Sequence, residues 1–254
     1  MSFSIGLIGY GHFGAFLHRL AGRFLPTAPF KVYARRAQPD GALYFSLAEV
    51  AACDVLILSV PISAYEATLR QIEPLLGPET VLVDVATVKL HTGRLLRAAA
   101  GDKRGFIATH PMFGPESYRK RGEEVAGLRI VITDHNLPDD TYQGVVTRLE
   151  GAGFRVLEKD AERHDKDLAE TLFLTHYIGQ VVARGGFERT DIDTVSFGYL
   201  MDAVDSVRHD GALFAEVCRY NPFCRQVIER VDDSDRALRE ELLGLLGNKG
   251  AGGW

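Results

Sequence analysis

The 254-residue sequence has few cysteines and no long hydrophobic run, and each absence excludes a class of protein. Its three cysteines, Cys53, Cys218 and Cys224, are an odd number without zinc-ligand spacing, which argues against a disulfide framework and favours a reducing compartment. The sequence contains no run of about 18 apolar residues, so no membrane span is predicted. The N-terminus enters a strand-like segment without a basic region and a cleavage site, so we expect no signal peptide and a cytoplasmic location.

The sequence also has no large excess of charge of either sign, with 29 Lys and Arg against 34 Asp and Glu. The net charge is −5 and the pI is about 5.9, so nothing suggests a nucleic acid or an acidic membrane as a partner. The hydrophobic fraction of 46% and the charged fraction of 25% are ordinary for a globular protein. The length allows one or two domains, each with a core of its own.

Short β-rich runs alternate with helical segments through the first part of the chain. Several runs, such as residues 55–58, are almost continuously apolar, which is typical of strands covered on both faces. The alternation predicts a parallel, doubly wound sheet in a domain of residues 1–159. The predicted strands are 3–8, 31–34, 54–60, 81–85, 105–109, 129–133 and 154–158.

The second part of the chain, residues 160–254, loses the β-rich runs and takes on helical periodicity. So small a helical domain rarely completes its own core, so we expect its apolar faces to pack against a second copy in a homodimer. The glycine-rich end, residues 247–254, is expected to fray.

A glycine-rich turn follows the first predicted strand and opens a helix. Residues 9–14 read Gly-Tyr-Gly-His-Phe-Gly, the GxGxxG pattern in which glycines allow a tight turn, a close approach to a pyrophosphate and close helix–strand packing. The helix N-terminus then offers free N–H groups to the phosphates. The context favours a Rossmann-type dinucleotide site over an ordinary turn. The expected contacts are Gly9, Gly11, His12, Phe13 and Gly14, with Ser59, Val60 and Pro61, at the end of the third strand, as a wall of the nicotinamide pocket.

The choice of dinucleotide depends on the end of the second strand. An NAD enzyme places a carboxylate there for the ribose 2′-hydroxyl, whereas this chain has Arg35 and Arg36. Two guanidinium groups suit a 2′-phosphate, so the sequence favours NADP over NAD. The alternative is that the pair merely lies in a solvated loop.

Polar residues at the ends of two later strands predict a chemical site, because ligands of open α/β sheets bind at the carboxyl ends of strands. The fourth strand ends in Asp84-Val85-Ala86-Thr87-Val88-Lys89, and the fifth in Thr109-His110-Pro111-Met112-Phe113-Gly114-Pro115-Glu116-Ser117. His110 is well placed for acid–base work, although a structural histidine is equally compatible with its position alone.

These two segments together resemble the prephenate/arogenate dehydrogenase family, particularly its arogenate-specific branch. The resemblance spans nearly the whole chain, and the string His-Pro-Met-Phe-Gly-Pro-Glu-Ser is its most specific part. Supporting segments follow in the family's order at 162–166, 173–176, 192–194, 220–222 and 229–232.

The resemblance implies a function and the roles of four residues. It implies oxidative decarboxylation of a cyclohexadiene substrate, arogenate or prephenate, giving tyrosine or its keto-acid precursor. His110 would be the general base on the ring hydroxyl, and Thr87 would share that hydroxyl or orient the histidine. Glu116 would lie at the mouth of the pocket, and His176 would face the cleft from the helical domain. No metal is expected.

Two departures from the family pattern leave the substrate open, with a preference for arogenate. Many prephenate-specific members carry a second histidine where this chain has Gly179, and they carry an arginine in the stretch that corresponds to residues 197–201, where this chain has none. Two rival functions are an NADP-linked β-hydroxyacid or imine reductase and a non-catalytic NADP-sensing protein.

Overall fold

The computed structural model describes residues 3–208 and 210–247. The chain divides into two compact units, residues 1–165 and 166–254, which are described separately. The division follows Asp165, whereas the sequence predicted a boundary after residue 159. The expected fraying at 247–254 falls on residues outside the described ranges, apart from Gly247, which the structure places in a helix.

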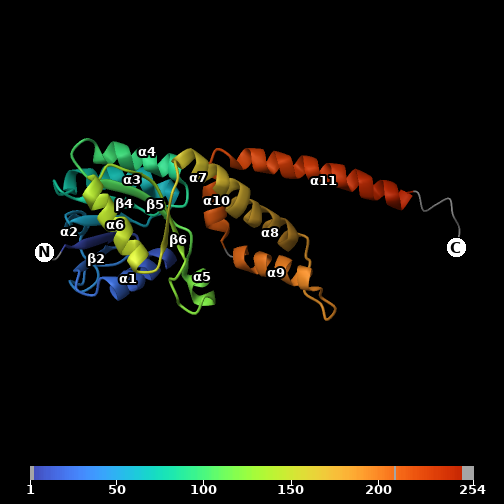
Figure 1. Cartoon of the computed structure of the whole chain (residues 1–254), viewed down its shortest axis with the longest axis horizontal. Coiled ribbons are helices and arrows are strands. Elements are labelled where there is room, and N and C mark those ends of the chain that lie inside the picture. Colours follow the sequence, from blue (N-terminus) through green and yellow to red (C-terminus); the bar gives the residue numbers. More distant parts are fainter. Residues whose placement is uncertain (1–2, 209, 248–254) are drawn as a thin grey trace. The chain divides into compact units, whose positions relative to one another are not determined.

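The first unit is built on a seven-stranded sheet with the order β2-β1-β3-β4-β5-β6-β7 (Figure 1). Every predicted strand is present, although most are a residue or more shorter than predicted. The strands are β1 (Ile5–Ile8), β2 (Phe30–Tyr33), β3 (Val55–Leu58), β4 (Val81–Asp84), β5 (Phe106–Pro111), β6 (Arg129–His135) and β7 (Arg155–Glu158).

The sheet is parallel from β2 to β5, as predicted, and departs from that prediction at one edge. Strand β6 runs antiparallel to β5, with a register shift at Ala108 and Thr109, and β7 runs parallel to β6. The segment between β5 and β6 holds only a six-residue helix, α5 (Pro115–Lys120), which contacts helix α1 (His12–Phe24) instead of crossing the sheet. The chain therefore re-enters the sheet from the edge at which β5 ends.

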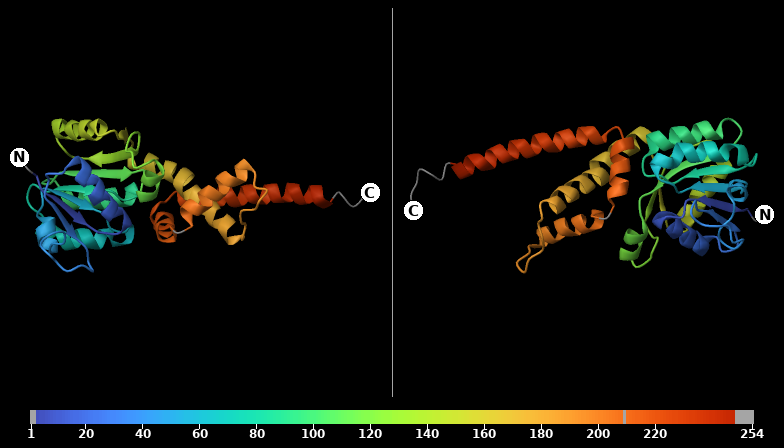
Figure 2. Two further views of the ribbon diagram at one scale, coloured as in Figure 1. Left: turned by 90° about the horizontal axis from the view of Figure 1, so that it is seen from below. Right: turned by 180° about the vertical axis from the view of Figure 1, so that it is seen from behind.

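Helices cover both faces of the sheet, which gives the predicted doubly wound, Rossmann-type architecture (Figures 1 and 2). On one face Tyr142 of α6 packs with Ile107 and Ile132 of the sheet. On the other face Thr92 of α4 donates a hydrogen bond to Asp84 at the end of β4. The remaining elements of this unit are α1 (His12–Phe24), α2 (Leu47–Ala51), α3 (Ile62–Ile72), η1 (Glu73–Leu75), α4 (Lys89–Ala100), α6 (Asp139–Gly151) and the start of α7 (Ala161–Leu168).

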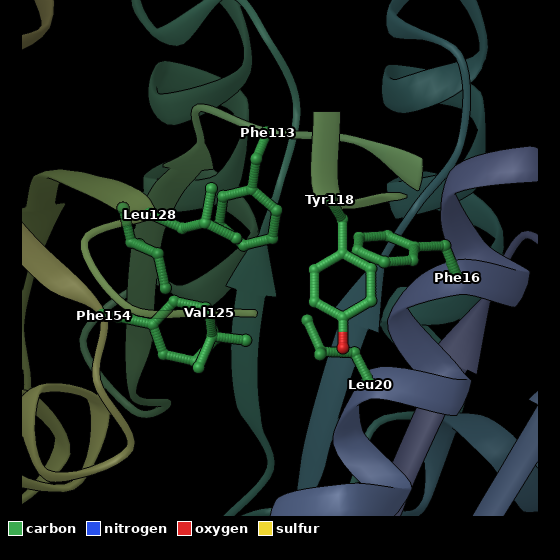
Figure 3. Close-up of a cluster of buried hydrophobic side chains, with 8 residues drawn as sticks. Phe16, Leu20, Phe113, Tyr118, Val125, Leu128 and Phe154 are labelled. Carbon is green, nitrogen blue, oxygen red and sulfur yellow. The ribbon is translucent and has the colours of Figure 1, made fainter. Parts of the chain in front are cut away.

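An aromatic cluster holds the segment after β5 against helix α1. The rings of Phe16 and Tyr118 lie 5.3 Å apart, and those of Phe113 and Phe154 stack at 5.7 Å (Figure 3). Phe113 is three residues from His110, so its burial fixes the course of the chain as it leaves β5. The cluster also fixes the position of α1, whose N-terminus follows the glycine turn.

The second unit is helical throughout its described residues, apart from the connecting loops. A π-helical turn follows α7, and Phe173 within that turn stacks on Phe214 at 5.2 Å. Helices α8 and α9 pack so closely that a Cβ atom on Gly179 would lie 2.5 Å from Cγ2 of Val207. The elements are η2 (Ala169–Phe173), α8 (Leu174–Arg184), α9 (Val195–Val207), α10 (Gly211–Tyr220) and α11 (Cys224–Gly247). In the described ranges, no helix has the length and apolar character needed to cross a bilayer.

Candidate active site

The glycine turn between β1 and α1 has a geometry that only glycine tolerates. Gly9 has a φ of +98°, and a Cβ atom there would lie 2.1 Å from the carbonyl oxygen of Ser59. A Cβ atom on Gly14 would lie 2.2 Å from the carbonyl oxygen of Gly9. Gly11, in contrast, faces open space, with no atom within 4 Å of the Cβ position. The first and third glycines therefore serve packing, and the second leaves the backbone open to a ligand.

The N-terminus of α1 presents free backbone donors beside that open space. Gly11 is the N-cap and supplies no side-chain hydrogen bond, and the first turn contains no acidic residue. Unpaired N–H groups and the positive end of the helix dipole favour an anion at this position. His12 is exposed, whereas the side chain of Phe13 packs toward the aromatic cluster, so Phe13 offers only its backbone. The arrangement fits a dinucleotide pyrophosphate.

The turn after β2 carries the two arginines. Arg35 and Arg36 are exposed, and in residues 3–208 neither forms an ion pair. The acidic residue that follows, Asp40, is occupied by its own loop, because its Oδ1 accepts the N–H groups of residues 42, 43 and 44 at 2.8–2.9 Å. These backbone hydrogen bonds lower the pKa of Asp40. The described loop therefore offers two unpaired guanidinium groups, and the Asp40 carboxylate is already hydrogen-bonded to the backbone.

The end of β3 lies against the glycine turn. The Ser59 N–H donates to the carbonyl oxygen of Ile8 at 2.8 Å, and the Ser59 Oγ atom would lie 3.3 Å from a Cβ atom on Gly14. Val60 is half-buried, and exposed Pro61 is the N-cap of α3. The predicted wall residues thus border the phosphate turn.

A buried ion pair joins the ends of β4 and β5. Lys89 and Asp84 both have 0% exposed side chains, and the Lys89 ammonium donates to Asp84 Oδ2 and, at 2.6 Å, to the carbonyl oxygen of Thr109. The Thr109 hydroxyl donates in turn to the carbonyl oxygen of Asp84 at 2.7 Å. Burial lowers the pKa of Lys89, and the negative charges of Asp84 and Asp165 oppose that effect. The pair fixes the two chain segments that carry Thr87 and His110.

His110 lies at the end of β5 and is part of a chain of three buried polar side chains. Its Nδ1 atom is 2.9 Å from Nε2 of His164, and Nδ1 of His164 is 2.8 Å from Oδ1 of Asp165. Burial lowers the pKa of His110 well below its usual value of 6.5, and the electrostatic interactions with His164 and Lys89 act in the same direction. His110 is therefore a neutral imidazole at neutral pH.

Asp165 also caps helix α4, which contains no cap of its own. The residue before the helix is Val88, whose side chain cannot accept a hydrogen bond. The N–H groups of Lys89 and Leu90 donate to the two carboxylate oxygens of Asp165, at 2.8 and 2.9 Å. In the sequence, His164 and Asp165 belong to the segment 162–166 that supports the family resemblance, and neither residue was predicted to have a role. The missing cap at Val88 was the signal that a distant acceptor was needed.

Two of the other predicted catalytic residues, Thr87 and Glu116, form no described hydrogen bond or ion pair with His110. Thr87 is half-buried in the loop before α4. Glu116 is exposed and pairs with Lys120 at 2.9 Å, and it lines a groove of about 510 Å³ between α1 and α5 that His110 does not reach. His176 belongs to the second unit, where it is buried and stacks on Phe214 at 6.0 Å. Burial lowers the pKa of His176, with Asp210 opposing, and its Nδ1 atom has no hydrogen-bond partner.

No cluster of three or more His, Cys, Asp or Glu side chains within the described residues could hold a metal ion. Nδ1 of His110 and Nε2 of His164 are hydrogen-bonded to each other, so these possible metal ligands do not converge on one point.

Comparisons with known proteins place this site in a family. The model of the prephenate dehydrogenase nucleotide-binding domain matches residues 37–129. Arogenate dehydrogenase 2, a chloroplastic protein of Arabidopsis thaliana, is 30% identical over 253 residues that cover 95% of this chain and 70% of the relative. The chain belongs to the prephenate/arogenate dehydrogenase family. This confirms the family that the motifs around Thr87 and His110 predicted, and it disfavours the reductase and the sensor.

One further relative and one solved structure also resemble the chain. Arogenate dehydrogenase 1 of Arabidopsis thaliana is 28% identical over 256 residues, which cover 95% of this chain but only 39% of that longer protein. The crystal structure of a prephenate dehydrogenase from A. aeolicus, in complex with hydroxyphenyl propionate and NAD+, superimposes with a TM-score of 0.73. That match covers 98% of this chain and 93% of the other at 18% identity, so it supports the fold.

Proposed function

We propose that the protein catalyses the NADP-dependent oxidative decarboxylation of arogenate or prephenate, giving tyrosine or 4-hydroxyphenylpyruvate. The observation that carries the proposal is His110, a buried neutral imidazole at the carboxyl end of β5. It lies on the same edge of the sheet as the glycine turn that follows β1. A general base and a dinucleotide site on one sheet edge are the two parts that this reaction requires.

The residues take complementary roles in this mechanism. The α1 N-terminus and the glycine turn would hold the pyrophosphate, and residues 59–61 would border the nicotinamide. A bound dinucleotide would supply the acceptor for the hydride that leaves the hydroxyl-bearing ring carbon. His110 accepts the hydroxyl proton on Nε2, and Thr87 helps to hold that hydroxyl. Loss of the ring carboxylate as carbon dioxide then makes the ring aromatic.

NADP is proposed over NAD because of the charges after β2. Arg35 and Arg36 offer two unpaired guanidinium groups, and the nearby carboxylate of Asp40 is committed to backbone N–H groups. Guanidinium groups bind phosphate in a bidentate manner, whereas a ribose 2′-hydroxyl is normally held by a free carboxylate.

Arogenate is proposed over prephenate for two reasons. The two Arabidopsis relatives are both named arogenate dehydrogenases. In addition, the close approach of α8 to Val207 leaves no room for a side chain at Gly179, the position of the second histidine in prephenate-specific members. We propose that Glu116 and His176 keep the roles that the resemblance implies, at the entrance to the substrate site and facing the substrate.

A homodimer formed through the second unit is part of the proposal. Ile192, Val195 and Tyr199 are 85%, 75% and 71% exposed, and the last two lie four residues apart on one face of α9. Helix α11 adds exposed leucines at 238, 242, 243, 245 and 246. Apolar surface of this extent favours association with a second copy.

The test is the initial rate of absorbance change at 340 nm for arogenate and for prephenate, each with NADP and with NAD. Turnover with arogenate and NADP is expected to be fastest. The His110→Asn variant should lose about 10²–10⁴ in kcat while it still binds NADPH, because a general base contributes about that much. Absence of turnover in every mixture, with NADPH still bound, would refute the proposed reaction and leave a dinucleotide-binding protein.

A further inference from the structure

The three polar side chains that end at His110 come from two elements far apart in the sequence. His110 ends β5, while His164 and Asp165 lie in α7. Their exposed fractions are 5%, 4% and 0%, so water does not compete for the hydrogen bonds between them. The proposed reaction uses only His110, which leaves two buried polar groups to be explained.

The contacts of Asp165 set the direction of the hydrogen bonds. Both of its oxygens accept backbone N–H groups at the start of α4, so the side chain acts as an acceptor at both ends, as a carboxylate does. The nitrogen of His164 that meets it, Nδ1, must therefore be the N–H donor. In neutral His164 the other nitrogen, Nε2, is then an acceptor.

The direction of the hydrogen bonds at His164 also fixes the tautomer of His110. Because Nε2 of His164 accepts, Nδ1 of His110 carries the hydrogen of the 2.9 Å bond. The lone pair of His110 then lies on Nε2, which forms no hydrogen bond with any described residue. A histidine with the opposite tautomer would present N–H at that position and could not take a proton.

We propose that His164 and Asp165 are positioning residues that hold His110 in the Nδ1–H tautomer, so that the lone pair of Nε2 is the base in the proposed reaction. The inference rests on the proposed function only for the identity of the proton that Nε2 receives. After that transfer, the new charge on His110 is shared through His164 with the carboxylate of Asp165, which stays ionised.

Asp165 has a second effect on the same site. By capping α4 it fixes the start of the helix that Thr87 and Val88 precede. One carboxylate therefore sets both the tautomer of the base and the position of the loop that carries Thr87.

The first measurement needs no substrate. In the wild-type protein labelled with ¹⁵N-histidine, two-bond ¹H–¹⁵N correlations distinguish the two neutral tautomers, and the His110→Asn spectrum identifies the signals of His110. The Nδ1–H pattern is expected, and an Nε2–H pattern would overturn the proposal. A protein with the Nδ1–H pattern but no turnover would contradict the proposed reaction while supporting the positioning role.

The second measurement separates positioning from packing. His164→Phe removes the acceptor and should lower kcat by about 10- to 100-fold, with KM and the Kd for NADPH changed by less than about twofold. His164→Gln should recover part of that loss, because its carbonyl oxygen can accept from Nδ1. His135→Phe is the matched control, since this half-buried histidine stacks on Tyr142 and is remote in sequence from both His110 and His164.

Asp165→Asn tests the direction of the chain. If the amide turns its NH2 toward His164, both tautomers reverse, and kcat should fall toward the loss of about 10⁴ known for a wrong tautomer in a catalytic histidine. Retention of kcat within about threefold in His164→Phe, or equal losses in the Phe and Gln variants, would refute the positioning role.

Discussion

The buried pair of Lys89 and Asp84 allows a quantitative prediction. Both side chains are 0% exposed, so Lys89→Met leaves the Asp84 carboxylate without a counter-charge in a dry site. Loss of one partner from a buried pair costs about 3–5 kcal/mol in the free energy of unfolding. Asp84→Asn should cost a similar amount, because it leaves the Lys89 ammonium with the Thr109 carbonyl and only the more distant negative charge of Asp165.

The double variant distinguishes charge from packing. Asp84→Asn with Lys89→Met removes both charges and keeps most of the volume, so its loss should be well below the sum of the single losses. Urea unfolding followed by circular dichroism gives the free energies, and Arg70→Met is the control. Arg70 pairs with Glu66 at the surface, where its side chain is 77% exposed, and its loss should cost about 0–1 kcal/mol. Single losses below about 1 kcal/mol at the buried pair, or a double loss equal to the sum, would refute the reasoning.

Three further predictions concern catalysis, cofactor choice and assembly. Because the pKa of His110 lies well below 6.5, the base stays neutral as the pH falls through 6.5, and kcat/KM should decline only at more acidic pH; an acidic limb centred at or above 6.5 would contradict this. Replacing Arg35 and Arg36 by serine should raise the Kd for NADPH by about 10- to 150-fold, since hydrogen bonds to charged groups contribute about 1.5–3 kcal/mol. Fluorescence titrations should show little change in the Kd for NADH. An equal increase in Kd for both cofactors would exclude a contact with the 2′-phosphate. Light scattering should give twice the 28.0 kDa chain mass, and Val195→Asp should reduce it; a wild-type monomer would refute dimerisation.

The sequence predicted the strands and the glycine turn because both depend on local pattern. Apolar runs such as 55–58 and the spacing of Gly9, Gly11 and Gly14 carry their structural meaning within a few residues. The direction of β6 was missed, because an apolar run reads the same in a parallel or an antiparallel neighbour.

The partners of His110 could not be predicted from pattern alone. His164 is 54 residues away in sequence, and only the packing of α7 beside β5 brings the two rings together. The role of Asp165 likewise depends on a helix start 76 residues earlier. The resemblance placed Gly179 at a position where other members carry histidine, but its close approach to Val207 is visible only in the packed helices.

The position of Asp165 has a consequence for how this chain can be divided or recombined. It is the last residue of the first unit, and α7 continues through it without a break into the second unit. A fragment ending at residue 159 would retain the whole glycine turn and all seven strands of the sheet, yet it would remove the acceptor from Nδ1 of His110 and the cap from α4. A hybrid enzyme that joins this first unit to a different helical unit therefore needs its junction after Asp165. Both positioning residues of the proposed base, His164 and Asp165, lie in α7, the helix that connects the two units.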